Sequence, residues 1–183
     1  MDGVQFAWLV AALVLMLWGV GAYNRLMSLR SAIGQAWAQI EELLRQREQV
    51  ALPLAQGLRK RLDDGGHACL DALVAAQAQV QADLTALRGR PLQQRSALAA
   101  FVAHDVACAD ALAGVQAAVV ADAAAASDPD LAIAFAELDR LDTRLAAARQ
   151  GFNDAAQAYD AAIAQFPTRL LVPWFGFERA GRL

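Results

Sequence analysis

An unbroken apolar run near the N-terminus constrains this chain most. Residues 6–22 read FAWLVAALVLMLWGVGA, and a polar Tyr-Asn-Arg sequence follows directly. A helix over residues 4–23 is about 30 Å long, which is the thickness of the hydrocarbon core of a bilayer. We therefore predict a transmembrane helix at residues 4–23, after a short N-terminal end at residues 1–3. The residues that we assign to the membrane span include Val4, Phe6, Trp8, Leu13, Trp18 and Tyr23.

A cleaved signal peptide is the alternative interpretation of this run. Signal peptides carry a basic segment before the apolar stretch. Here the charged groups before the stretch are only the amino group and Asp2. The small residues 19–22, GVGA, match a cleavage site only loosely. The sequence therefore favours a permanent anchor.

The charges beside the span predict its orientation. Arg25 and Arg30 follow the span closely, and basic flanks remain in the cytoplasm. We expect a single-pass protein of the inner membrane, with the N-terminus outside and the C-terminal body in the cytoplasm.

The composition of the body, residues 24–166, predicts an all-α fold. Ala, Leu, Gln, Arg, Glu and Asp dominate, and alternating β-branched runs are absent. The net charge of -3 provides no broad basic surface for nucleic acid. The two cysteines, Cys69 and Cys108, fall on apolar helical stretches and are interpreted as small buried thiols.

Four clusters of turn-forming residues divide the body. They are Pro53, residues 63–66 (DDGG), residues 88–91 (RGRP) and residues 127–130 (SDPD). Pro53 is ambiguous, because a proline either starts a new helix or kinks a long one. The third segment is expected to run from Leu92 to about Ala126.

Apolar residues recur at helical spacing in all four segments. Such stripes must face one another, so we predict an antiparallel, mostly up-down bundle of about four long helices that continues from the membrane helix. The stripes contain Leu26, Ile33, Ile40, Leu29, Ala36 and Leu43; Leu70, Leu73, Gln77, Val80, Leu84 and Leu87; Leu98, Phe101, Asp105, Cys108, Leu112, Val115 and Val119; and Leu131, Leu138, Leu145, Phe152, Tyr159 and Phe166.

An even number of alternating helices returns the chain to the membrane. The tail, residues 167–183, is therefore expected near the bilayer, where Trp174, Phe175 and Phe177 would act as interfacial aromatics. The alternative is that these aromatics cap the open end of the bundle.

Known motifs for catalysis are absent from the sequence. It contains no phosphate-binding glycine loop, no His-Glu-x-x-His, no Cys-x-x-Cys and no nucleophile elbow. A metal site built from His67, Cys69, His104 and Cys108 is disfavoured, because metal ligands usually occur at short paired spacings. We assign no catalytic residue, no cofactor and no metal, and Asp105 is interpreted as a residue at the edge of the bundle.

Two conspicuous side chains on the first segment invite a functional interpretation. Trp37 and Gln39 are possible contacts for a partner, although Trp37 flanks the apolar stripe and is favoured as a packing residue. Asn153 and Asp154 on the fourth segment are expected to hydrogen-bond a neighbouring helix or loop.

Motifs at both ends of the chain resemble the LemA family. The matching residues are Tyr23, Asn24, Leu26, Leu29, Ala36, Trp37, Gln39, Arg45, Arg47 and Pro53, and then Ala148, Arg149, Phe152, Asn153, Ala155, Tyr159, Phe166, Pro167, Phe175, Gly176 and Phe177. The resemblance implies an N-terminally anchored helical bundle with no established enzymatic activity.

Two classes of function follow. The first is a non-enzymatic membrane-anchored scaffold or interaction protein, whose partners are the bilayer and either further copies of itself or another membrane protein. The alternative is a membrane-tethered module that binds a metal or ligand in a pocket lined by His104, Asp105 and Cys108.

Overall fold

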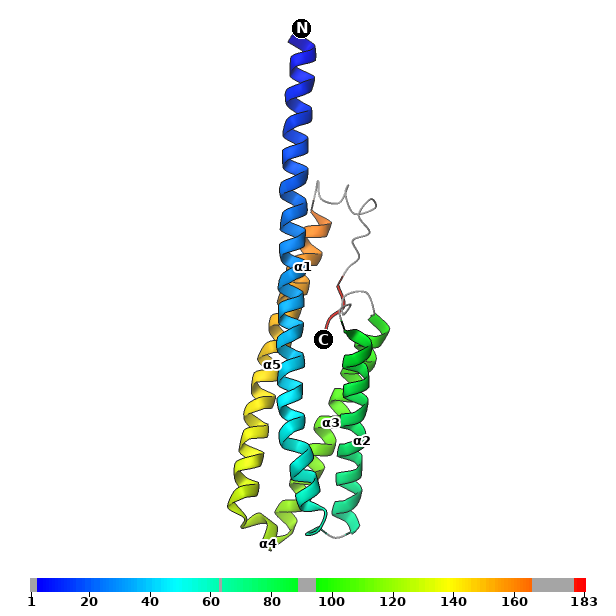
Figure 1. Ribbon diagram of the computed structural model, residues 1–183, viewed down its shortest axis with the longest axis vertical. Coiled ribbons are helices and arrows are strands. Elements are labelled where there is room, and N and C mark those ends of the chain that lie inside the picture. The colour runs from blue at the N-terminus through cyan, green and yellow to red at the C-terminus, as the bar shows by residue number, and fades with distance from the viewer. Residues whose placement is uncertain (1–2, 63, 89–94, 166–179) are drawn as a thin grey trace.

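The computed structural model describes residues 3–62, 64–88, 95–165 and 180–183, with the side chains of Asp64 and Arg95 left out. Its helices are α1 (Gly3–Leu58), α2 (Asp64–Leu87), α3 (Arg95–Ala121), the single turn α4 (Ala123–Ala126) and α5 (Pro129–Ala164). These ranges contain no strand, and the four long helices run antiparallel in an up-down bundle (Figure 1). The predicted all-α bundle is confirmed.

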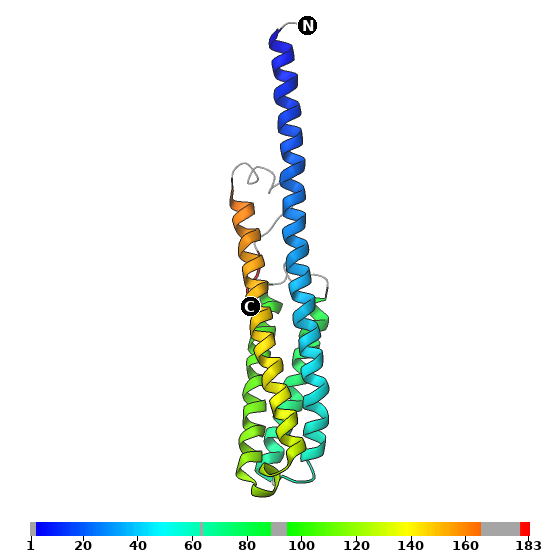
Figure 2. The ribbon, with the colours of Figure 1, turned by 90° about the vertical axis from the view of Figure 1, so that its left-hand side faces the viewer.

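Helix α1 is one continuous helix of 56 residues, and its two halves have opposite surroundings. The half near the N-terminus stands clear of the other helices in two perpendicular views (Figures 1 and 2). Its most apolar window has a mean hydropathy of 2.0 and is 0% buried within the structure. From Leu26 to Leu58 the same helix supplies residues of the core. A helix compatible with a single membrane span therefore continues into the bundle without a break.

One further helix is apolar enough to pass a test for a membrane span. Residues Ser96–Ala121 of α3 have a mean hydropathy of 1.5, and 33% of that window is buried. Since α3 packs along α2 and contributes Phe101 and Cys108 to the core, its apolar character is explained at least in part by the bundle.

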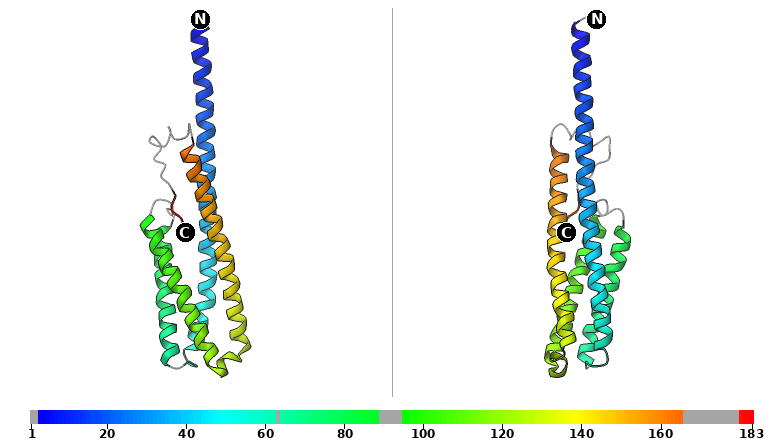
Figure 3. Two further views of the ribbon diagram at one scale, coloured as in Figure 1. Left: turned by 180° about the vertical axis from the view of Figure 1, so that it is seen from behind. Right: turned by 60° about the vertical axis from the view of Figure 1, so that its left-hand side comes forward.

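The bundle consists of two closely packed helix pairs. Helix α1 packs mainly on α5, and α2 packs mainly on α3, while the contact between α1 and α2 is sparse. Figure 3 shows α1 and α5 extending beyond the ends of α2 and α3 on the side of the N-terminus. At that end Arg25 Nη1 donates to Gln165 Oε1 over 3.5 Å, so the end of α5 lies level with the end of the apolar run.

The predicted stripes form the core. Every predicted stripe residue on α2 and α3 is buried, as are Leu26, Ile33, Ile40 and Leu43 on α1 and Leu138, Leu145, Phe152 and Tyr159 on α5. Leu29, Ala36 and Leu131 are half-buried at the margin of the core. Phe166 lies outside the described residues.

Three of the predicted breaks lie at helix ends, the structure decides the alternatives left open at Pro53, and one further break was not predicted. Residues 63–66, 88–91 and 127–130 coincide with helix ends, and Asp128 caps α5 by accepting from the Asp130 amide at 2.9 Å. Pro53 lies inside α1. The third segment does not continue to Ala126, because Asp122 ends α3 and accepts from the Ala124 amide at 2.9 Å to start α4.

Candidate functional site

Three charged side chains from three different helices meet inside the bundle. Arg47 of α1 donates from Nη2 to Oδ1 of Asp105 on α3 over 2.6 Å. Arg149 of α5 pairs with the other carboxylate oxygen of Asp105. The side chains of Arg47 and Asp105 are only 3% and 4% exposed. Since α1 and α5 form one helix pair and α3 belongs to the other, this carboxylate joins the two pairs.

A second carboxylate completes the group. Arg47 Nη1 lies 3.4 Å from Oδ1 of Asp142 on α5, which is more exposed. We call Arg47, Asp105, Asp142 and Arg149 the charge cluster. Two guanidinium groups and two carboxylates balance in formal charge, and this balance is the condition under which charges are tolerated in a core.

Burial affects the titration of groups in and beside the charge cluster. Desolvation has the largest effect on Arg149 and lowers its pKa from the ordinary value, and the positive charge of the neighbouring Arg47 lowers this pKa further. Desolvation also raises the pKa of the Cys108 thiol, which lies close enough to Arg47 to feel its charge. Cys108 is therefore a neutral thiol at neutral pH, as expected of a small buried core residue.

Hydrogen bonding inside the core is incomplete at two donors. Arg47 Nε and Gln77 Nε2 are buried and have no hydrogen-bond partner among the described residues. A buried donor without a partner costs on the order of 1–3 kcal/mol. The polar residues on the stripes are therefore not explained by stability alone, because apolar residues at the same positions would avoid this cost.

The four candidate metal ligands do not form a common site among the described residues, and both histidines are bonded to other groups. His104 Nδ1 lies 2.6 Å from Asp83 Oδ2 on α2, and a ring nitrogen of His67 bonds to the Arg59 carbonyl oxygen at 2.8 Å. Cys69 is half-buried and Cys108 is buried, and both are free thiols. Within the described part of the chain, no three His, Cys, Asp or Glu side chains converge on a common point. Asp105, predicted at the edge of the bundle, instead lies in its interior.

Trp37 belongs to the core. Its ring is 4% exposed and meets Phe101 and Phe152 edge-to-face, at centroid distances of 5.4 and 5.9 Å. Its indole Nε1 donates to Glu41 Oε1 at 2.6 Å. These contacts give Trp37 the packing role that the sequence favoured. Gln39, in contrast, is exposed on a shallow groove between α1 and α5, while Trp174, Phe175 and Phe177 lie outside the described residues.

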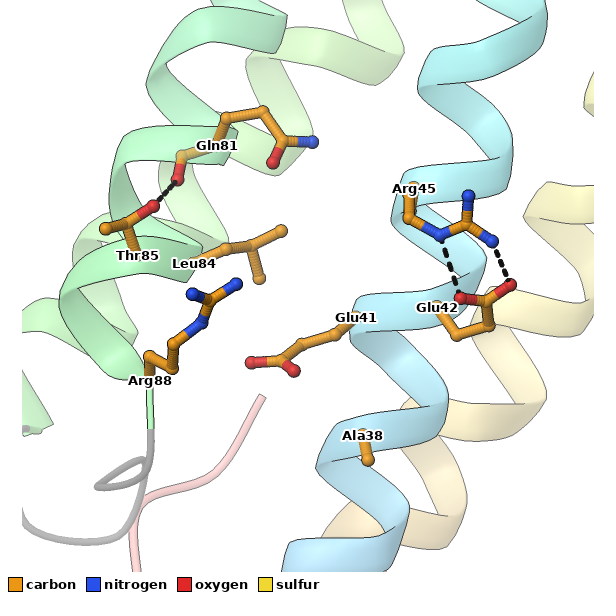
Figure 4. Close-up of a pocket in the computed structure, with 8 residues that line it drawn as sticks. All are labelled: Ala38, Glu41, Glu42, Arg45, Gln81, Leu84, Thr85 and Arg88. Atoms are coloured by element: carbon orange, nitrogen blue, oxygen red, sulfur yellow. Dashed lines mark hydrogen bonds and ion pairs between the residues drawn. The ribbon is translucent and has the colours of Figure 1, made fainter.

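A polar cleft of about 250 Å³ separates α1 from α2 where these helices diverge. Figure 4 shows Glu41 and Arg88 extending into the space between the helices, whereas Glu42 and Arg45 pair along α1. Hydrogen bonds from Arg45, and then from Gln46, lower the pKa of Glu42 to about 2. Because several lining groups are already bonded within the chain, we assign this cleft no chemistry.

The C-terminal residues return to α5. Asn153 hydrogen-bonds the backbone of Leu183 in both directions, and Asp160 accepts from the amide of Ala180 at 2.8 Å. The predicted bonding of Asn153 to a neighbouring segment is confirmed. Asp154 instead accepts from Gln150 at 2.8 Å, within its own helix.

Sequence reasoning missed the charge cluster, although one signal for it was present. Arg47 continues the seven-residue series of Leu26, Ile33 and Ile40, and Asp105 stands on the stripe of α3. Charged residues on two core stripes indicate a buried pair when the stripes face each other. Asp142 and Arg149 follow the buried residues Leu141 and Ala148 by one position, outside the stripe, and carried no such signal.

Comparison with known proteins agrees with the motifs at the two ends of the chain. The model of the LemA family matches residues 36–182, which is most of the chain. No curated protein matches the chain.

Proposed function

Because the chain belongs to the LemA family, we propose that it is a membrane-anchored, non-enzymatic scaffold or interaction protein. It acts at the bacterial inner membrane, through contacts with other proteins or through self-assembly. The observation that carries this proposal is the continuity of α1, whose most apolar window is unburied among the described residues while its remainder builds the bundle core. A bundle attached in this way is presented to partners at the membrane surface.

The orientation is part of the proposal. The N-terminus lies outside and the bundle lies in the cytoplasm, since Arg25 and Arg30 flank the span on the bundle side. Protease added to intact spheroplasts is expected to spare the bundle, and to digest it after the membrane is permeabilised. Digestion in intact spheroplasts would reverse the orientation.

The C-terminal tail gives the protein a second contact with the bilayer. The contact between Arg25 and Gln165 supports this, because it brings the beginning of the tail level with the end of the membrane span. Trp174 is then expected to show blue-shifted fluorescence and quenching by shallow lipid probes in vesicles. Emission and quenching typical of a solvated indole would contradict the contact.

The first experiment measures the subunit count. The full chain is extracted in mild detergent, analysed by size exclusion with light scattering and imaged by electron microscopy. A defined homo-oligomer, or a stable complex with another membrane protein trapped by crosslinking in native membranes, is expected. A monomer that captures no partner in native membranes would overturn the proposed function.

A further inference from the structure

Two side chains of α5 hold the last residues of the chain by their backbone. Asn153 Nδ2 donates to the Leu183 carbonyl oxygen at 2.8 Å, and the Leu183 amide donates to Asn153 Oδ1 at 2.9 Å. The Ala180 amide donates to Asp160 Oδ1 at 2.8 Å. We call Asn153 and Asp160 the C-terminal cradle.

The spacing of the C-terminal cradle suits an extended peptide. Its two residues are seven positions apart on one face of α5, which is about 10 Å along the helix axis. The three steps from Ala180 to Leu183 also cover about 10 Å when the chain is extended. Both side chains therefore meet backbone groups at the two ends of one short peptide.

Apolar and ionic contacts accompany these bonds. Ala180 is 7% exposed, and Leu183 packs at the margin of the core. Arg182 Nη2 lies 3.9 Å from Asp160 Oδ2. Residues 180–183 are thus held by backbone hydrogen bonds to the C-terminal cradle, by burial of Ala180, by an ionic contact of Arg182 and by apolar packing of Leu183.

The connection between α5 and residues 180–183 is long enough to reach the C-terminal cradle of a neighbouring copy. Asp160 and Gln165 are about 7.5 Å apart along α5, whereas the connection formed by residues 166–179 can extend to about 45 Å. The C-terminal cradles of anchored neighbours also stand at one height above the bilayer, since Gln165 contacts Arg25 beside the span. Confinement to one plane raises the effective concentration of neighbouring tails.

We propose that the C-terminal cradle is a self-association site that takes residues 180–183 of a second copy. Exchange of an identical segment preserves every contact seen within one chain and therefore joins copies at low cost. This inference rests on the proposed function and specifies how its self-assembly occurs.

Disulfide trapping in membranes tests the exchange. Gln157→Cys and Arg182→Cys are introduced together into a full-length chain that carries Cys69→Ser and Cys108→Ala. Gln157 is exposed on α5 between the two cradle residues, and Arg182 lies between Ala180 and Leu183 with its side chain 3.9 Å from Asp160. This pair of positions is therefore chosen for the disulfide, because both Asn153 and Asp160 are kept. After mild oxidation, exchange gives a covalent dimer on a non-reducing gel. A disulfide closed within single chains, or no disulfide above the control, would overturn the proposal.

Matched variants separate specific pairing from random collision. Ala147→Cys with Arg182→Cys is the control, because Ala147 is exposed but lies about 15 Å along α5 from Gln157. The dimer yield of the test pair should exceed that of this control several-fold, and adding Asn153→Ala and Asp160→Ala should reduce it to the control level. If light scattering finds an oligomer while the disulfide closes within one chain, self-assembly stands and tail exchange fails.

Discussion

At the scale of single residues, the charge cluster is the most informative part of the molecule. Asp105 receives guanidinium groups from α1 and α5, so its carboxylate fixes α3 against the other helix pair at one height. Burial of apolar area is not directional and does not by itself select one alignment of the helices, whereas the charged triplet satisfies its bonds in only one alignment. The charge cluster therefore specifies the alignment of the two helix pairs.

Removing the central carboxylate should be costly. Asp105→Leu leaves the nearly inaccessible Arg47 with only the more distant Asp142, and we expect the free energy of unfolding to fall by about 3–5 kcal/mol. Replacing the triplet together, as Arg47→Met, Asp105→Leu and Arg149→Leu, should cost much less, since no buried charge loses its partner. Guanidinium unfolding followed by circular dichroism measures both. Equal losses in the two variants would contradict this account.

The cap of α5 should make stability depend on pH. A hydrogen bond from Arg61, and then one from the Asp130 backbone, lower the pKa of Asp128. A carboxyl group with a lowered folded pKa stabilises the fold above its unfolded pKa of about 4, and this contribution is lost as pH falls through the folded pKa. Asp128→Asn keeps the cap but removes the charge, so its melting temperature should lie below that of the unaltered chain at pH 6, and the difference should shrink as the pH falls below about 4. A constant difference across this range would exclude the carboxylate as the cause.

At the scale of helices, the sequence predicts most of the architecture because local chemistry determines it. Turn formers mark three breaks, and seven-residue spacing identifies the buried stripes. The break at Asp122 escaped detection because alanines surround it and the segment looks like continuous helix. The charge cluster escaped because Arg47 and Asp105 are 58 positions apart, and only the packing of whole helices brings them together.

At Pro53 the local preference of the residue disagrees with the structure, because proline disfavours a helix interior and Pro53 lies inside α1. A proline inside a helix removes one backbone bond and clashes with the preceding turn, at about 3 kcal/mol relative to alanine. Pro53 is exposed within α1, so Pro53→Ala should stabilise the bundle by up to about that amount. Gln49→Ala, at an exposed position one turn earlier, should change stability little. An unchanged or lower denaturation midpoint for Pro53→Ala would show that the proline suits the local backbone.

At the scale of the whole molecule, we expect the apolar N-terminal part of α1 and the bundle to be separable in stability although they share one helix. No part of the most apolar window of α1 is buried against the bundle. Deleting residues 1–22 should therefore give a protein that stays in solution without detergent and unfolds at the midpoint of the full chain. Measuring both midpoints in the same detergent removes the effect of the solvent. Aggregation or loss of cooperative unfolding would show that the bundle requires its anchor.

The continuity of α1 also determines how far the opposite end of the bundle lies from the proposed membrane span. From Tyr23 to Leu58 the helix rises about 50 Å, so α4 stands that far above the bilayer surface if the span is upright. With no hinge between span and bundle, a small tilt of the span displaces this distant tip by many ångströms. If residues 4–23 span a bilayer as proposed, a change in lipid thickness that tilts this span therefore displaces the far end of the bundle sideways.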